Sequence, residues 1–227
     1  MSRNVPEYRF ERLCGHFGGG NPAGGLWIIG IEEGGYWTSA QEADEFIERR
    51  GDQSYDSRQP GDPDVKRWRI TPIVSKICHG ITGLGGSWQE FRNEHYLTRS
   101  GPLFITNIYP LAKPSASHVP DSYAEWFGIV DAKDYRVKTQ KSGRFDVLRD
   151  MWLKNTPRVT LCHGKGSWGD FRSLLGLQGR PESIDGGRIQ AYEAGVFLTP
   201  HLSWSVHMPE SAILELVKYA RCKWQTR

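Results

Sequence analysis

Residues 26–35 have the sequence Leu-Trp-Ile-Ile-Gly-Ile-Glu-Glu-Gly-Gly, in which a short apolar run ends in two adjacent carboxylates and two glycines. The run at 26–29 is too short for a helix and is typical of a strand buried on both faces. Ligands of open parallel sheets bind at the carboxyl ends of the strands. We therefore expect Glu32 and Glu33 at a ligand-binding edge, the alternative being a solvated turn that only ends the strand.

Three more apolar runs predict strands, at 103–108, 158–162 and 196–199. Helices are predicted between them, from Ser39 to Arg50, from Thr71, at 123–130, at 144–153 and from Pro209. Strands that alternate with helices imply right-handed crossovers and a parallel sheet covered on both faces. The expected fold is thus α/β, a three-layer α-β-α arrangement with a central four-stranded, mainly parallel sheet.

Local signals refine these helices. Ser39 and Glu42 form a capping box, and Thr71 is expected to cap a helix with Pro72 in its first turn. Ser87 and Ser167 are predicted as two similar helix caps. Buried stripes are expected at Ile73, Val74 and Ile77, and at Ile213, Leu214 and Val217 in the last helix.

The length of 227 residues and the 38% hydrophobic content suit a single domain over 1–227. We expect residues 1–25 to be a loop-like N-terminal extension, with insertions near 51–66 and 115–143. The net charge of +3 permits a local basic groove without indicating one. No apolar leader is seen, and no segment approaches the ~18 apolar residues of a membrane span. We therefore expect a cytoplasmic monomer with no membrane partner.

The four cysteines have no spacing typical of a zinc or iron–sulfur site; they are Cys14, Cys78, Cys162 and Cys222. Two of them begin a Cys-His-Gly triplet, at 78–80 and 162–164. A metal site built from both triplets is one interpretation, but neighbouring side chains of a strand point to opposite faces. Buried thiols are favoured, and we expect no metal and no cofactor.

Polar groups follow three of the predicted strands: the carboxylates of Glu32 and Glu33, the amide of Asn107 and the imidazole of His201. Converging on one sheet edge, they would supply a water activator, a hydrogen-bonding group for a substrate and a donor to a leaving group. Taken singly, Asn107 is equally typical of a turn before Pro110, and His201 of a satisfied loop histidine.

The order of these motifs resembles that of the uracil-DNA glycosylase superfamily. Gly30-Ile-Glu-Glu-Gly34 resembles its water-activating motif, written G-Q-D-P-Y in the best known branch and G-E-A-P-G in another. The strand that ends in Asn107 resembles the one whose asparagine recognises the base, and 199–205 is similar to the H-P-S-P-L-S motif. The resemblance covers about residues 26 to 222, and the missing cysteine framework argues against the iron–sulfur branches.

Carried over by position, Glu32 would activate water, Asn107 would hydrogen-bond the flipped base, His201 would stabilise charge on the departing base, and Ser203 would hold a DNA phosphate. Cleavage of an N-glycosidic bond builds positive charge on the sugar and negative charge on the base, so a carboxylate and a nearby donor are what the reaction needs. The base must first leave the stack.

The remaining site candidates line the base or touch DNA. Base contacts are assigned to Ile31, Glu33, Gly34 and an aromatic wall at Trp68; DNA contacts are assigned to Lys113, Ser115, Lys165, Ser203 and the wedge candidate Trp204. The alternatives are that Trp68 is core, that Trp204 is loop packing and that the lysines are solvated surface charge.

Two departures from the family motif bear on the substrate. Gly34 stands where the best known branch has a tyrosine that blocks substituents at C5 of the pyrimidine, and Glu33 stands in place of a proline. We therefore expect a DNA glycosylase for a C5-substituted pyrimidine, such as the glucosylated hydroxymethylcytosine of phage DNA. Uracil is the alternative, because the amide of Asn107 can present a donor or an acceptor.

Other classes stay open from the sequence. Ile31 and Glu33 break the motif, as expected of a DNA-binding protein that has kept the fold and lost the reaction. A hydrolase of small nucleotides or nucleosides would use similar carboxylate chemistry. The chain has no Gly-x-Ser-x-Gly, Gly-x-x-x-x-Gly-Lys or Gly-x-Gly-x-x-Gly, which disfavours acyl hydrolases, nucleoside triphosphatases and dinucleotide enzymes.

Overall fold

The computed structural model describes residues 5–32, 35–50, 55–67, 69–115, 117–202 and 208–226. Its strands are β1 Gly19–Gly20, β2 Leu26–Gly30, β3 Leu103–Asn107, β4 Val159–His163, β5 Glu182–Ile184, β6 Ile189–Tyr192 and β7 Val196–Thr199. Its α-helices are α1 Val5–Cys14, α2 Ala40–Arg50, α3 Thr71–Thr82, α4 Trp88–Glu94, α5 Ser122–Phe127, α6 Ala132–Lys141, α7 Arg144–Asn155, α8 Trp168–Leu175 and α9 Glu210–Gln225. Short 3-10 helices lie at η1 Pro22–Gly24, η2 Pro63–Arg67, η3 Lys165–Ser167 and η4 Asp185–Gly187.

The strands form one mixed sheet of seven, in the order β1-β3-β2-β4-β7-β6-β5. The four predicted strands are its centre, β3-β2-β4-β7, and all three pairings among them are parallel. The expectation of a four-stranded sheet was therefore right for the centre and wrong for the edges. There, β1 and the β5–β6 pair add antiparallel strands of two to four residues, too short to give a period-two pattern.

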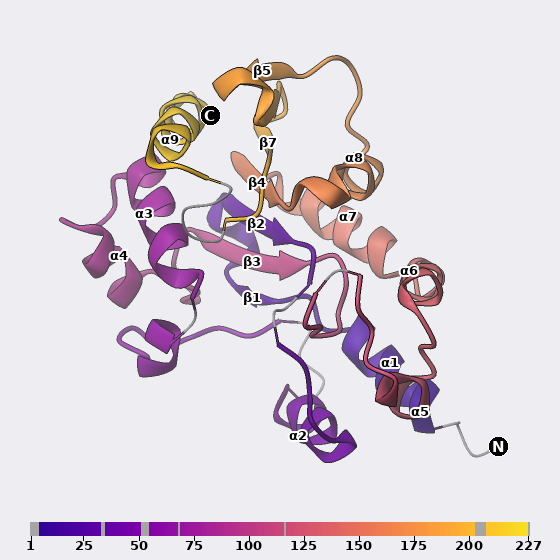
Figure 1. Ribbon diagram of the computed structural model, residues 1–227. Helices are drawn as coiled ribbons and strands as arrows, with labels where there is room; N and C mark the ends of the chain where they lie inside the picture. The colour runs from indigo at the N-terminus through magenta and orange to yellow at the C-terminus, as the bar shows by residue number, and fades with distance from the viewer. Residues whose placement is uncertain are drawn as a thin grey trace.

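Helices cover both faces of this sheet, which gives the three layers expected (Figure 1). Trp27 and Ile29 of β2 face a core shared with α1 and α5–α8, whereas Leu26 and Ile28 face a core shared with α3, α4 and α9. All four side chains are at most 1% exposed. Burial of such side chains contributes about 1.5–3 kcal/mol each, which explains why an unbroken apolar run forms the central strand.

Several helix signals are confirmed, and two caps are corrected. Ser39 Oγ accepts the Glu42 N–H at 3.2 Å, and Ser87 Oγ accepts the Glu90 N–H at 3.2 Å. Thr71 is the first residue of α3, and the N-cap position falls one residue earlier, on Ile70, which already has helical φ and ψ. Ser167 stands at the N-cap position of α8, as predicted, but its side chain makes no capping hydrogen bond.

Three segments differ from the expectations. Residues 1–25 were predicted as a loop, but α1 and β1 lie there, since Phe10, Leu13 and Cys14 bury one side of an otherwise charged helix. In the 115–143 segment α5 matches the helix predicted at 123–130, whereas α6 was not predicted. In α9, Ile213 and Val217 pack against the core as predicted, but Leu214 is 63% exposed, and the fully buried positions are Ala212, Leu216 and Ala220.

The 51–66 excursion lies partly outside the described residues, which resume at Tyr55. Its described part runs along the sheet: Asp56 bridges to Gly19, and Arg58 bridges to Thr98. No helix among the described ranges has the length and apolar character needed to cross a bilayer.

One buried cation fixes the end of β3. The guanidinium of Arg144, at the start of α7, donates to the backbone carbonyls of Asn107 at 2.7 Å and Ile108 at 3.1 Å. It also donates to the carbonyls of Cys14 at 2.8 Å and His16 at 2.5 Å, just after α1. Arg144 is 3% exposed, so it connects the N-terminal helix, β3 and α7 inside the protein.

We predict that Arg144→Met lowers the free energy of unfolding by about 3 kcal/mol or more, because it leaves several buried carbonyls unpaired at about 1–3 kcal/mol each. Urea unfolding followed by tryptophan fluorescence measures the change. Arg149→Met, on the same helix at an exposed position, is the matched control and should change stability by less than about 0.5 kcal/mol. Equal effects of the two substitutions would contradict the role assigned to Arg144.

Candidate active site

The carboxyl ends of the four central strands lie side by side. Gly30 pairs with Asn107, and His163 pairs with Thr199. Glu32 follows Gly30 by two residues and His201 follows Thr199 by two. Neighbouring strands are about 4.8 Å apart, so β2 and β7, which flank β4, are about 10 Å apart. The structure therefore brings Glu32, Asn107 and His201 to one edge of the sheet, as the sequence predicted.

Gly30 is required where these strands end. A Cβ on Gly30 would lie 2.3 Å from Oδ1 of Asn107 and 3.0 Å from Nε2 of His163. The two polar side chains thus close over the bare Cα of Gly30 from the strands on either side. They lie on the face that β2 presents to α3 and α9, since Ile28, two residues before Gly30, packs there.

Glu32 lies at the edge on the side of the sheet covered by α1 and α5–α8, and it is paired with a buried lysine. Its carboxylate lies 3.1 Å from Nζ of Lys113, and the two side chains are 10% and 2% exposed. Burial raises the pKa of Glu32, while Lys113 and the more distant Arg136 oppose that rise. The ammonium of Lys113 also lies 5.0 Å from the ring centre of Tyr135.

Tyrosines from the two helices of the 115–143 segment hold the loop that carries Lys113. The hydroxyl of Tyr135 accepts the Leu111 N–H at 2.6 Å, and the hydroxyl of Tyr123 donates to the Ala112 carbonyl at 2.6 Å. Burial raises the pKa of Tyr123 to about 12, so the phenol keeps its proton at neutral pH. Helices α5 and α6 therefore support the site as well as covering the sheet.

Two imidazoles meet at the ends of β4 and β7. The rings of His163 and His201 are 5.0 Å apart, centre to centre, and stand nearly perpendicular at 81°. His201 is exposed, whereas His163 is 6% exposed. Burial, and then the neighbouring His201, lower the pKa of His163 to about 3. The pair thus consists of one neutral buried imidazole and one that faces solvent.

The sequence reasoning did not assign His163 to the site. It named His163 only as part of a Cys-His-Gly triplet, although the buried run before it and the glycine after it were the available signal. Gly164 allows Ile31 to approach, since a Cβ on Gly164 would lie 2.4 Å from Cδ1 of Ile31.

Among the described residues no group of three His, Cys, Asp or Glu side chains is placed to hold a metal ion.

The other candidates are placed as follows. Ile31 is half-buried against Gly164, and Ser115 and Lys165 are exposed. Lys113, expected to touch a DNA phosphate, is instead buried against Glu32. Five candidates lie outside the described residues, namely Glu33, Gly34, Trp68, Ser203 and Trp204.

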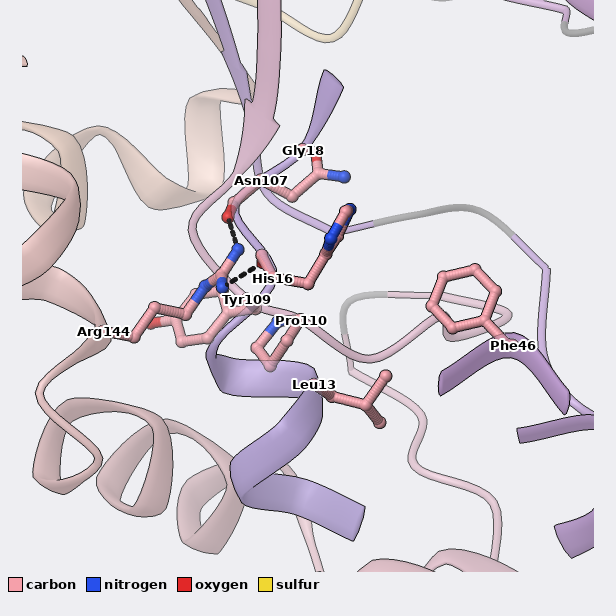
Figure 2. A pocket seen from close by; sticks show the side chains of 8 residues that line it. All are labelled: Leu13, His16, Gly18, Phe46, Asn107, Tyr109, Pro110 and Arg144. Atoms are coloured by element: carbon pink, nitrogen blue, oxygen red, sulfur yellow. Dashed lines mark hydrogen bonds between the residues drawn. The ribbon is translucent and has the colours of Figure 1, made fainter. Parts of the chain in front are cut away.

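An open pocket with about 300 Å³ of empty space, continuous with solvent, lies beside the end of β3. It is lined by Leu13, His16, Gly18, Phe46, Asn107, Tyr109, Pro110 and Arg144. Figure 2 shows the Asn107 amide next to the His16 ring, with Phe46 of α2 on the far side. Glu32 and His201 do not line it, so it shares only Asn107 with the edge described above.

We predict that Lys113→Met lowers the free energy of unfolding at neutral pH by about 3–5 kcal/mol, since it leaves the Glu32 carboxylate buried without its partner. The raised pKa of Glu32 must then rise further. Stability of the variant is lost as pH rises through that pKa and regained as pH falls below it, so the deficit against wild type should narrow in acid. Urea unfolding at several pH values measures this.

The double variant Glu32→Gln/Lys113→Met is the control, because it removes both charges. It should recover most of the stability that Lys113→Met loses. A double variant as unstable as Lys113→Met would mean that packing, rather than charge pairing, sets the effect.

Comparison with known proteins does not assign this chain to a family. Neither a scan against protein-family models nor a search of curated proteins finds a match. Its function is therefore argued from the geometry of the sheet edge and from the order of its motifs.

Proposed function

We propose that this protein is a DNA glycosylase that hydrolyses the N-glycosidic bond of a flipped pyrimidine and leaves an abasic site. The observation that carries the proposal is that Glu32, which is paired with Lys113, as well as Asn107 and His201, lie at or just beyond the carboxyl ends of the central parallel strands, at the same edge of the sheet. The four parallel strands at the centre of the sheet, with helices on both faces, form a general α/β fold; the glycosylase-like form of that fold is part of the proposal.

The chemistry assigned to each group follows from its surroundings. Glu32, ionised beside Lys113, would orient the attacking water and stabilise positive charge on the sugar. His201, exposed and about 10 Å away across two strand spacings, would donate to the base as negative charge develops there. Asn107, at the end of the strand outside β2, would hydrogen-bond the base.

The burial of Glu32 and Lys113 favours a reaction over mere binding. A buried ion pair contributes little net stability, because the loss of hydration offsets the attraction between the charges. A carboxylate with a raised pKa beside a specific charged partner is characteristic of catalytic sites. We therefore assign Lys113 to holding Glu32, in place of a phosphate contact, and leave DNA contacts with the exposed Ser115 and Lys165.

The base is proposed from the motif sequence. Gly34 in place of a tyrosine removes the group that would exclude a C5 substituent, so a C5-substituted pyrimidine such as a hypermodified cytosine is the first candidate and uracil the second. A DNA-binding protein without activity is a further candidate, because the motif departs from the family at Ile31 and Glu33.

The first test incubates the protein with oligonucleotides that carry one uracil, 5-hydroxymethyluracil, 5-hydroxymethylcytosine or glucosylated hydroxymethylcytosine, and then cleaves abasic sites with alkali. We expect strand breaks with one or more of the C5-substituted bases. Glu32→Gln should lower the rate by about 10²–10⁴-fold, and His201→Ala should also lower it by at least about 10²-fold. Glu48→Gln, an exposed glutamate on α2, is the matched control and should leave the rate unchanged.

Other outcomes select the alternatives. Breaks only at uracil would assign the protein to repair of deaminated cytosine. Tight, salt-dependent binding without abasic sites would favour the inactive DNA-binding protein. Hydrolysis of free nucleosides at the rate seen in DNA would refute a DNA glycosylase.

The pH dependence of excision provides a second test. Glu32 acts as a carboxylate and its pKa is raised, so the rate should fall as pH falls, with a midpoint above that of an ordinary glutamate. Lys113→Met removes the charge that opposes the rise and should move this midpoint to higher pH. If the rate of Lys113→Met falls with the same pH midpoint as that of wild type, the role given to the Glu32–Lys113 pair is contradicted.

A further inference from the structure

His163 is a buried titratable side chain at the sheet edge that the proposed reaction leaves without a role. It ends β4, between the strand that leads to Glu32 and the strand that leads to His201. With Gly30, Asn107 and Thr199 it forms one row across the four central strands. Its position is therefore set by rigid elements rather than by a loop.

The polar atoms of this row are available for a ligand. Within the described part of the chain, Nδ1 of His163 is buried and has no hydrogen-bond partner. The side-chain amide of Asn107 is half-buried and makes no hydrogen bond to another described residue; the bonds at this residue go to its backbone carbonyl. A buried polar group without a partner is costly and uncommon in native structures, so a partner from outside the chain is indicated.

The amide of Asn107 and the imidazole of His163 come together over residue 30 because it is glycine. Asn107 Oδ1 and His163 Nε2 both come within 3.0 Å of the point where a Cβ would stand. Any side chain at residue 30 would push the amide and the imidazole apart. The glycine thus keeps two hydrogen-bonding groups close enough to meet neighbouring atoms of one planar ligand.

We propose that His163 is a base-recognition residue that acts together with Asn107, the two hydrogen-bonding adjacent atoms of the flipped pyrimidine across Gly30. The proposal rests on the proposed function and names the residue that helps to select the base. His163 does not act on the leaving group; that role stays with the exposed His201.

The chemistry of a neutral imidazole suits this role. The lowered pKa of His163 keeps the ring uncharged at neutral pH, so one ring nitrogen donates and the other accepts. Uracil and cytosine differ at two adjacent ring positions. Uracil has a carbonyl at C4 next to the N–H of N3, whereas cytosine has an amino group at C4 next to an N3 without a proton. The Asn107 amide can turn to suit either base. The ring nitrogen of His163 beside Asn107 donates in one tautomer and accepts in the other, and the tautomer that binds the base then determines which orientation of the amide is productive.

The test measures kcat/KM for the best substrate and for the same DNA with the other base, uracil or the matching cytosine. His163→Leu should reduce the ratio of the two values by about 10-fold, the worth of one hydrogen bond between neutral groups. His163→Gln, which keeps a donor and an acceptor, should retain part of the preference. The substitution should change mainly the ratio of the two kcat/KM values. The pH midpoint of the rate, which is assigned to Glu32, should stay the same.

An unchanged ratio in His163→Leu, with activity retained, would overturn the proposal. A structural role alone would lower both values together and leave the ratio as it was. Circular dichroism and urea unfolding of each variant separate loss of fold from loss of recognition.

A second measurement does not depend on turnover. Wild-type protein labelled with ¹⁵N at histidine is titrated with free uracil, cytosine and 5-hydroxymethylcytosine while the imidazole nitrogen resonances are recorded. We expect the His163 resonances to move with the base that is preferred in DNA, and Asn107→Ala to weaken the effect. A protein that cuts no DNA yet shows this shift would refute the glycosylase and support base recognition by His163. Excision by wild type with no shift for any base, together with an unchanged ratio in His163→Leu, would support the glycosylase and refute base recognition by His163.

Discussion

The geometry of the whole sheet edge depends on where the chain goes after β3, and that is set by the buried guanidinium of Arg144. Beyond the last strand pairing, the carbonyls of Asn107 and Ile108 have no sheet partner, and buried carbonyls must be satisfied. Arg144 satisfies both and holds the carbonyls that follow α1 as well. The backbone of Asn107 is therefore fixed by a residue 37 positions away, and its side chain is free to meet a ligand.

A second buried cation performs a different task. Lys113 lies between the carboxylate of Glu32 and the ring of Tyr135, on a loop that the hydroxyls of Tyr123 and Tyr135 hold in place. Arg144 stabilises neutral carbonyls, whereas Lys113 stabilises a charge. Since a buried ion pair of this kind contributes little to stability, its position at the strand end is best explained by the need for an ionised carboxylate there.

The parts of this structure that the sequence predicted are those that depend on local pattern. The central strands are unbroken apolar runs, and Glu32, Asn107 and His201 could be placed at one sheet edge because each ends or follows such a run. The burial of Lys113 and His163 could not be predicted in this way. The burial of Lys113 depends on the packing of Tyr135 of α6 against it, and the burial of His163 depends on its position between β2 and β7. Helix α1 was missed because charged residues outnumber the three that it buries.

The edges of the sheet carry a consequence for how the protein behaves in a crowded cell. An exposed strand is a template on which another chain can add, and its hazard grows with its length. Here one edge is β1, only two residues long, and its outer side is already occupied: Gly20 donates to the Asp56 carbonyl at 2.7 Å, and Asp56 donates to the Gly18 carbonyl at 2.9 Å. The other edge is β5, three residues that begin with the charged Glu182. The apolar strands at the centre are thus shielded from the edge-to-edge pairing that leads to aggregation.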